Sequence, residues 1–325
     1  MKILVTGTAG FIGFHLCEKL LQDKHQVLGI DNINNYYDVK LKKDRLKILL
    51  GKKNFKFKKI DISDTNFVKK IYPIAKNFKV IIHLAAQAGV RYSITHPYKY
   101  IESNVKAQVS ILELAKKIKN FNHLIYASSS SVYGYNKKIP FAVDDRVDDP
   151  ASLYGATKRS AELISSSYSK MFNIKCTGLR FFSVYGPWGR PDMAAYIFTK
   201  SLFKDKQIDL FNYGRMERDF TYIDDIVSGI NCLIKSKKNK RKIENKIYNL
   251  GNNKPEPLLK LLKLLEKFTG KKAKIKKTKM QLGDVRFTYA NINNSKKDFK
   301  FSPKVKIEDG LLEFVNWFKN YHKIS

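Results

Sequence analysis

The sequence predicts an α/β protein built on a doubly wound parallel sheet, with a smaller mixed α/β portion towards the C-terminal end. Three observations lead to this prediction. Short apolar runs recur along the first half of the chain, and each ends in small or polar residues. Amphipathic stretches that are typical of helices separate these runs, as expected for alternating strands and helices. The first run passes directly into a glycine-rich turn.

The composition fits a folded protein but is strongly basic. The chain has 325 residues, of which 43% are hydrophobic, enough for one large or two modest domains. Its 62 Lys+Arg against 29 Asp+Glu give a formal charge of +33, yet lysine is scattered over nearly every segment. A nucleic-acid binder would gather its charge on one face and interleave aromatic residues. We therefore attribute the excess of lysine to codon bias and do not expect a nucleic-acid partner. The alternative is a polyanion site at the short lysine-rich runs 235–242 and 271–279.

Cysteine usage and hydropathy predict a cytoplasmic protein. The three cysteines lie far apart without metal-ligand spacing, so we expect neither a metal site nor a disulfide framework. No apolar run approaches the roughly 18 residues that a membrane span needs. The first predicted strand begins at Lys2, which leaves no room for a signal peptide.

The glycine turn predicts a dinucleotide site. Residues Lys2 to Thr6 form an apolar run suited to a buried strand, G-T-A-G-F-I-G follows, and an amphipathic helix starts at about Phe11. Glycines spaced in this way permit a tight turn and let backbone N–H groups approach a pyrophosphate at the helix N-terminus. The alternative is a purely structural loop. The cofactor contacts expected here are Gly7, Gly10, Phe11, Ile12 and Gly13.

The strands that follow extend this site. The run H-Q-V-L-G-I leads into Asp31, about 20 residues after the turn. A carboxylate at this position accepts hydrogen bonds from the adenosine ribose hydroxyls of NAD and repels the 2′-phosphate of NADP. The predicted cofactor is therefore NAD(H) rather than NADP(H). Later strands end at Asp61, at Ala86 and in the serines after His123, where the carboxyl edge of a parallel sheet holds a ligand. The further expected cofactor contacts are Asn32, Asp61, Ile62, Leu84, Ala85, Ala86 and Asn104.

Two later segments carry candidate catalytic side chains: a run of serines, and a tyrosine followed by a lysine. The strand from His123 runs into S-S-S-S-V-Y-G, and S-L-Y-G-A-T-K-R-S later puts Tyr154 and Lys158 one helical turn apart. A tyrosine is a poor base at neutral pH until a nearby cation lowers its pKa, and Lys158 supplies such a charge. Tyrosine and lysine also occur at this spacing by chance on many helices, so the neighbouring motifs decide between the two interpretations.

With the glycine turn, the serines and Tyr154-x-x-x-Lys158 in that order, the chain resembles the extended short-chain dehydrogenase/reductase superfamily of nucleotide-sugar epimerases and dehydratases. The resemblance covers the whole chain and implies a Rossmann-type sheet. It implies that Tyr154 is the acid/base, that Lys158 lowers its pKa and holds the nicotinamide ribose, and that Ser129 bonds the reacting hydroxyl, with Ser130 beside it. It also implies an NAD-binding domain at residues 1–182, a mainly sugar-nucleotide-binding portion at residues 183–325 with the chain crossing back, and a homodimer.

The residues before V-Y-G distinguish members of the superfamily. Dehydratases carry an Asp-Glu pair there and UDP-glucuronate decarboxylases carry a Glu, whereas this chain has Ser130-Ser131. Without a carboxyl group, neither elimination nor acid-assisted decarboxylation has its proton carrier, which leaves epimerisation.

Two stretches resemble the CapI-like UDP-glucuronate 4-epimerases: D-N-I-N-N-Y-Y-D-V-K-L-K at 31–42 and R-F-F-S-V-Y-G-P-W-G-R-P-D-M at 180–193. UDP-galactose 4-epimerases usually have Asn where this chain has Ser183. A guanidinium is suited to binding a carboxylate, so Arg190 and Ser183 are the expected contacts for the C6 carboxylate of a uronate. The resemblance also implies that the product is used in surface polysaccharide synthesis. Alternatively, Arg190 orders its loop or pairs with Asp192.

The C-terminal half supplies three further candidates for the UDP group. Arg218 lies in a segment that resembles the family's pyrophosphate-binding arginine segment, and Asp284 in Q-L-G-D-V resembles a residue near the nucleotide. Arg91 is a third candidate, with a surface position as its alternative. Two other functions stay open: a 4-epimerase for UDP-galactose or UDP-N-acetylgalactosamine, and a non-catalytic NAD-sensing or polyanion-binding module.

Overall fold

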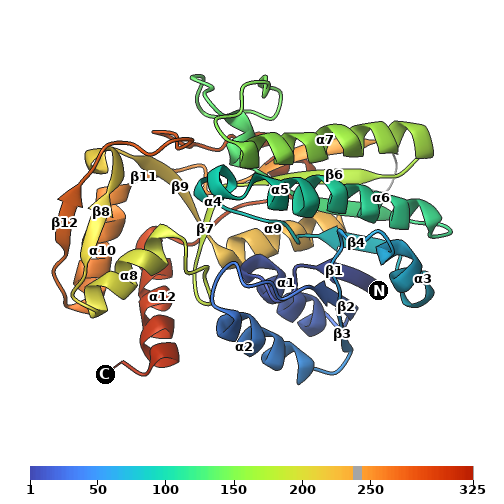
Figure 1. Ribbon diagram of the computed structural model, residues 1–325, viewed down its shortest axis with the longest axis horizontal. Coiled ribbons are helices and arrows are strands. Elements are labelled where there is room, and N and C mark those ends of the chain that lie inside the picture. The colour runs from blue at the N-terminus through green and yellow to red at the C-terminus, as the bar shows by residue number, and fades with distance from the viewer. Residues whose placement is uncertain (237–243, 325) are drawn as a thin grey trace.

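The computed structural model describes residues 1–236 and 244–324 and is built around one sheet of parallel strands (Figure 1). The order of the strands is β10-β6-β5-β4-β1-β2-β3, and all neighbouring pairs are parallel. The predicted doubly wound Rossmann-type sheet is therefore confirmed. The strands are β1 (Lys2–Thr6), β2 (Gln26–Asp31), β3 (Phe55–Lys59), β4 (Val80–His83), β5 (His123–Ser129), β6 (Cys176–Phe181) and β10 (Asn245–Leu250).

Helices cover both faces of this sheet, which explains why its central strands are continuous apolar runs. Every residue of β4 and β6 is buried. Figure 1 shows one layer of helices above the sheet and another below it. The upper layer contains α3 (Phe67–Ala75), α4 (Val90–Thr95), α5 (Pro97–Tyr100), the π-helical turn Ile101–Lys106, α6 (Ala107–Lys117) and α7 (Leu153–Phe172). The lower layer contains α1 (Phe11–Gln22), α2 (Val39–Leu50) and α9 (Ile223–Lys235).

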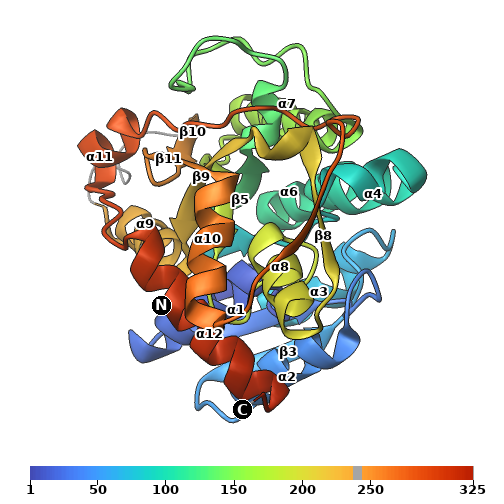
Figure 2. The same ribbon diagram turned by 90° about the vertical axis from the view of Figure 1, so that its left-hand side faces the viewer.

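The smaller portion combines short strands with helices at the left-hand end of the molecule in Figure 1, and Figure 2 shows this portion facing the viewer. Strand β9 (Glu217–Tyr222) pairs with β7 (Ser183–Tyr185) and β11 (Pro255–Pro257), and β8 (Gln207–Leu210) pairs with β12 (Lys274–Lys277). The helices here are α8 (Ala194–Phe203), α10 (Leu258–Thr269) and α12 (Ile307–His322), whereas α11 (Asn293–Phe299) packs against β10 and α9 at the main sheet. Strand β10 joins the main sheet although it comes after residue 183, so the chain crosses between the two portions.

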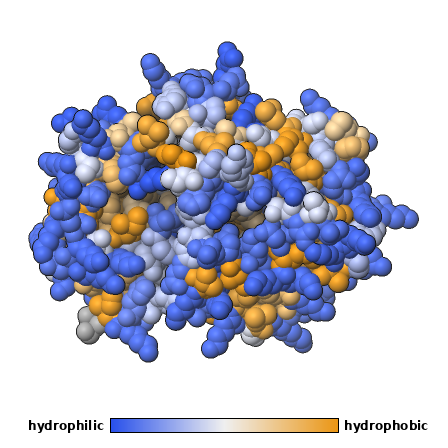
Figure 3. Space-filling model, viewed as in Figure 1, coloured by the Kyte–Doolittle hydropathy of each residue, from blue (hydrophilic) through white to orange (hydrophobic). Residues whose placement is uncertain are grey.

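Hydrophilic side chains cover most of the face seen in Figure 3. Of the two lysine runs, residues 237–242 lie outside the described part of the chain, and the second run includes the exposed strand β12. Among the described residues, no helix is long and apolar enough to cross a membrane, and no cluster of His, Cys, Asp or Glu could hold a metal ion.

Candidate active site

The glycine turn after β1 packs directly against the end of β4. Gly7 has φ +76°, and a Cβ atom there would lie 2.7 Å from the backbone nitrogen of Ala85. A Cβ atom on Gly13 would lie 2.0 Å from the carbonyl oxygen of Gly7. Only glycine fits at these two positions. The turn therefore brings the N-terminus of α1 to the point in the sheet where strand order reverses, which is the usual ligand position in such sheets.

Asp31 ends β2 beside this turn. Its carboxylate accepts hydrogen bonds from the N–H groups of Ala9 (3.1 Å) and Ile33 (2.8 Å). Burial raises the pKa of Asp31, while these bonds and the nearby Lys42 ammonium act in the opposite direction. At the end of β3, Asp61 accepts from Asn32 Nδ2 at 2.8 Å.

A first cavity runs along the carboxyl ends of these strands. With one exception, every cofactor contact expected from the sequence lines it, including Tyr154 and Lys158. The exception is Asn104, which is buried. Its side-chain oxygen accepts from the Gln87 N–H at 2.8 Å, and its side-chain nitrogen donates to the Gln87 carbonyl at 3.0 Å. Because Gln87 lines the cavity and Asn104 does not, Asn104 shapes the cavity wall from behind, contrary to the expectation that it contacts the cofactor.

Tyr154, Lys158 and Ser129 meet at the inner end of this cavity. Helix α7 begins at Leu153, where the Ser152 hydroxyl accepts from Gly155 N–H at 3.1 Å and caps the first turn. Burial lowers the pKa of Lys158 to about 8, and the Glu162 carboxylate opposes this shift. No hydrogen bond to the Lys158 ammonium is found in the described part of the chain. A buried ammonium that faces a cavity without a partner is suited to a polar ligand group.

The pKa of Tyr154 departs from the sequence-based expectation. Burial raises it above the ordinary value of 10, and a hydrogen bond with Ser129 and the Arg190 charge only partly oppose this effect. Lys158 is not among the groups that shift it. Sequence spacing could not indicate the depth of burial of Tyr154, which disfavours a charged phenolate.

A second cavity adjoins the first and is shared between the sheet and the smaller portion. Ser129, Tyr154 and Arg190 line both cavities. The structure brings all the expected substrate contacts into this second cavity, far apart as they are in the sequence. These residues are Ser129, Ser130, Tyr154, Ser183, Arg190, Arg218, Asp284 and Arg91.

Arg190 already has a carboxylate partner. Its Nε and Nη2 atoms donate to the two oxygens of Asp192 at 3.0 and 2.5 Å, and Tyr36 donates its hydroxyl to Asp192 at 2.9 Å. The alternative that Arg190 pairs with Asp192 is thus what the structure contains. The Nη1 atom has no hydrogen bond among the described residues, so one end of the guanidinium stays available to a ligand.

The two other arginines lie at the far end of the second cavity. Arg218 Nη2 donates to Asp284 at 2.9 Å and to the Val285 carbonyl at 2.6 Å, which fixes the plane of its guanidinium. Burial lowers the pKa of Arg218, although Asp284 opposes this. Arg91 is exposed and lies over the Phe211 ring, with 4.5 Å between the guanidinium carbon and the ring centre.

Comparison with known proteins identifies the family. The family model described as the NAD dependent epimerase/dehydratase family matches residues 3–251. The chain belongs to this family. It is an NAD-dependent nucleotide-sugar 4-epimerase, because close relatives and structural neighbours share that activity.

Three relatives of this epimerase match almost its whole length. Protein CapI of Staphylococcus aureus is 47% identical over 99% of this chain and 100% of its own. UDP-glucuronate 4-epimerase 2 of Arabidopsis thaliana is 43% identical over 99% of this chain and 77% of its own. The solved structure of UDP-glucuronic acid 4-epimerase from Bacillus cereus, in complex with UDP-glucuronic acid and NAD, has a TM-score of 0.92 at 36% identity and covers 99% of this chain and 100% of that one.

The first cavity of the epimerase fits the NAD that its family uses. The turn at Gly7 and Gly13 has no space for side chains, Asp31 ends β2 as a carboxylate, and the Lys158 ammonium lines the cavity with no hydrogen-bond partner among the residues that the structure describes. Asp31 at the end of β2 suits an adenosine ribose, the glycine turn after β1 suits the pyrophosphate, and Lys158 suits a nicotinamide ribose on the β4–β5 side, so the pyrophosphate position lies between the two riboses.

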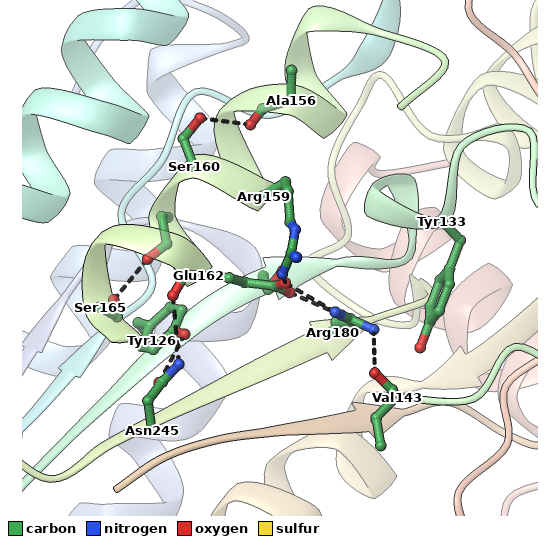
Figure 4. A network of polar contacts seen from close by, with 12 residues as sticks. Tyr126, Tyr133, Val143, Ala156, Arg159, Ser160, Glu162, Ser165, Arg180 and Asn245 are labelled. Atoms are coloured by element: carbon green, nitrogen blue, oxygen red, sulfur yellow. Dashed lines mark hydrogen bonds and ion pairs between the residues drawn. The ribbon is translucent and has the colours of Figure 1, made fainter. Parts of the chain in front are cut away.

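A buried network behind α7 supports the epimerase site (Figure 4). Glu162 accepts from Arg180 Nε and Nη2 at 2.8 and 2.9 Å, and from the Ser128 hydroxyl at 2.6 Å. Arg180 also lies over the Tyr133 ring at 4.8 Å. The network joins α7, which carries Tyr154, to β5 and β6.

Sequence reasoning did not assign Tyr36 or Gln87 to the epimerase site. Tyr36 lines both cavities, and Gln87 lines the first. Tyr36 lies within the stretch 31–42 that resembles the epimerases, so a signal for it was present. No local pattern pointed to Gln87, whose position depends on Asn104.

Proposed function

We propose that this epimerase interconverts UDP-glucuronate and UDP-galacturonate by transient oxidation at C4, with NAD kept bound throughout. The observation that carries the proposal is that Arg190 and Ser183 line the same cavity as Tyr154. A cation and a hydroxyl beside the acid/base suit a substrate whose C6 is a carboxylate. The names of the relatives at 43% and 36% identity support the same substrate.

The residues of the chain divide the proton chemistry between them. In the proposed reaction the Tyr154 oxygen takes the proton from the sugar 4-hydroxyl, and the Ser129 hydroxyl, which lines the same cavities as Tyr154, binds that 4-hydroxyl. NAD held in the first cavity by the glycine turn, Asp31 and Lys158 would supply the hydride acceptor and donor that inversion at C4 needs. Tyr154 then gives its proton back to O4. The Arg190 charge is the cation that favours the phenolate, and the Lys158 ammonium is left to bind the cofactor.

A uronate brings a hazard that Arg190 is placed to manage. Oxidation at C4 gives a β-keto acid, which loses CO2 when its C4–C5–C6 geometry lets the breaking bond align with the carbonyl π system. In the proposal, the free Nη1 end of Arg190 and the Ser183 hydroxyl hold the carboxylate out of that alignment. Asp192 and Tyr36 fix the guanidinium so that only this end faces the sugar.

The experiment that tests this proposal replaces Arg190 by Ala and analyses the products by chromatography. We expect the KM for UDP-glucuronate to rise about tenfold or more, because a charge-assisted bond is lost, and a UDP-pentose to appear. Arg146→Ala is the matched control, since Arg146 is 92% exposed and lines neither cavity. An Arg190→Ala enzyme that is slower but releases no pentose would contradict the carboxylate clamp.

We also propose that the product serves surface polysaccharide synthesis and that the enzyme is a homodimer. The first point is suggested by the resemblance of residues 31–42 and 180–193 to the CapI-like epimerases. Support for the second comes from apolar side chains on α7 that are exposed in the single chain, namely Leu163, Met171 and Phe172. Figure 3 shows apolar surface in the upper part of this face, with further apolar patches lower down and on the left.

A further inference from the structure

Arg45 on α2 is a buried cation that the proposed chemistry does not use. Its side chain is fully buried, and no ion pair joins it to a carboxylate within the described residues. Burying a charge is costly unless its donors are satisfied, so the contacts of this guanidinium are informative. Four acceptors surround it: the carbonyls of Ala9, Trp188 and Gly189 and the hydroxyl of Tyr37.

These contacts connect the two halves of the active site. Nη1 donates to the Ala9 carbonyl at 2.9 Å, inside the glycine turn that faces the pyrophosphate position. Nη2 donates to the Trp188 carbonyl at 2.5 Å and reaches the Gly189 carbonyl at 3.4 Å. Gly189 directly precedes Arg190. One guanidinium thus holds the NAD turn and the loop that carries the substrate-binding arginine.

The same loop is held from the NAD side at two further points. His15 on α1 binds the Pro187 carbonyl through Nε2 at 2.9 Å, and Tyr36 binds Asp192. Trp188 adopts φ +59°, a left-handed conformation that a bulky residue rarely takes. A donor on its carbonyl is one way to maintain that conformation.

We propose that Arg45 is a positioning residue that couples NAD binding to the placement of Arg190. The Ala9 peptide is the link, because its N–H donates to Asp31 and its carbonyl accepts from Arg45. A dinucleotide that orders the glycine turn orders Arg45, and through it the Trp188–Arg190 segment. By thermodynamic reciprocity, a uronate held by Arg190 tightens the binding of NAD. This last consequence rests on the proposed substrate, whereas the link from the turn to the loop does not.

The test uses Trp188 as its own reporter. The sequence has two tryptophans, so a Trp317→Phe parent leaves Trp188 as the single emitter in the loop. Protein freed of NAD is titrated with NAD⁺, and Trp188 emission and the NAD dissociation constant are measured. Arg45→Met is compared with Lys47→Met, which removes an exposed cation from the same helix. Arg45→Lys is added because it keeps the charge but loses the fork that spans both loops.

We expect the parent and Lys47→Met to show a saturable change in Trp188 emission. Both Arg45 variants lose that change and bind NAD about tenfold more weakly, the effect of losing charge-assisted hydrogen bonds. The proposal is overturned if the parent gives no response or if either folded Arg45 variant responds like Lys47→Met. A second titration adds UDP-glucuronate, which tightens NAD binding in the parent and not in the Arg45 variants.

The two titrations separate the two proposals. If Trp188 responds to NAD only when Arg45 is present, but UDP-glucuronate has no effect on the parent and is not converted, the coupling stands and the assigned substrate falls. If UDP-glucuronate is converted while all variants respond alike, the substrate stands and the coupling falls.

Discussion

At the scale of single residues, burial acts on the two central groups in opposite directions. It raises the pKa of Tyr154 and lowers that of Lys158 to about 8. Both shifts favour the uncharged forms, because charges are poorly solvated in a closed site. The Ser129 hydrogen bond and the Arg190 charge are the groups of the chain that favour a Tyr154 phenolate. The strength of the base is therefore set by its partners more than by helical spacing.

The first prediction follows from this arrangement. Tyr154→Phe keeps the ring but removes the only atom proposed to carry the 4-hydroxyl proton, so we expect turnover to fall by about 10²- to 10⁴-fold. NAD retention and the affinity for UDP should change little. Steady-state kinetics and calorimetry check both points, with Tyr98→Phe as a control because Tyr98 is 82% exposed. Turnover close to that of the unmodified enzyme would mean that another group carries the proton.

At the scale of elements, the position of α7 depends on its buried ion pair. Glu162 is one turn beyond Lys158, and its bonds to Arg180 and Ser128 hold the helix against β6 and β5. The side chains of Glu162 and Arg180 are 1% and 2% exposed. Removing one member of such a pair leaves the other charge buried without compensation.

We predict that Glu162→Gln lowers the free energy of unfolding by about 3–5 kcal/mol, which denaturant titration measures. The double variant Glu162→Gln/Arg180→Met should lose less than the sum of the two single variants, since no uncompensated charge remains. Glu113→Gln serves as the comparison on α6, because its pair with Lys116 is partly exposed and surface pairs contribute about 0–1 kcal/mol. Equal losses for Glu162 and Glu113 would contradict the role given to the network.

The same scale shows what the sequence could predict. Four strands and the ligand-binding residues at their ends were predictable. Burial on both faces leaves a continuous apolar run in each strand, and the edge of the sheet needs small or polar residues, here Gly7, Asp31, Ala86 and the serines after His123. The place of Asn104 behind the cavity wall was not predictable. It depends on how a π-helical turn meets the loop after β4, which no local pattern encodes. The Arg190–Asp192 pair could be named only as one of two alternatives.

At the scale of the whole molecule, buried histidines link stability to pH. Burial lowers the pKa of His15 to about 4 and those of His83 and His123 to about 3, from an ordinary value of 6.5. At each of these three histidines the unfolded chain therefore binds more protons than the folded one between pH 6.5 and 4, which lowers stability as the pH falls. Asp219 has the opposite sign, because burial raises its pKa to about 6 and the folded state then binds the extra proton.

We predict that the imidazoles outweigh Asp219, so the free energy of unfolding falls from pH 6.5 towards pH 4. Each imidazole contributes about 1.4 kcal/mol per pH unit in this range. Denaturant titrations at several pH values measure the slope. His123→Asn, which lies at the start of β5 and contacts Thr177, should reduce the slope by one imidazole's share. An unchanged slope in that variant would show that His123 does not titrate as the structure implies.

The central claim is that this epimerase acts on a uronate at C4 and retains its NAD. Proton NMR of the purified protein with UDP-glucuronate and no added cofactor tests it most directly, by following the anomeric and H4 signals over time. We predict that UDP-galacturonate rises to a steady mixture with UDP-glucuronate and that no pentose appears. If UDP-glucuronate stayed unchanged while UDP-galactose was converted, the carboxylate site at Ser183 and Arg190 would be contradicted.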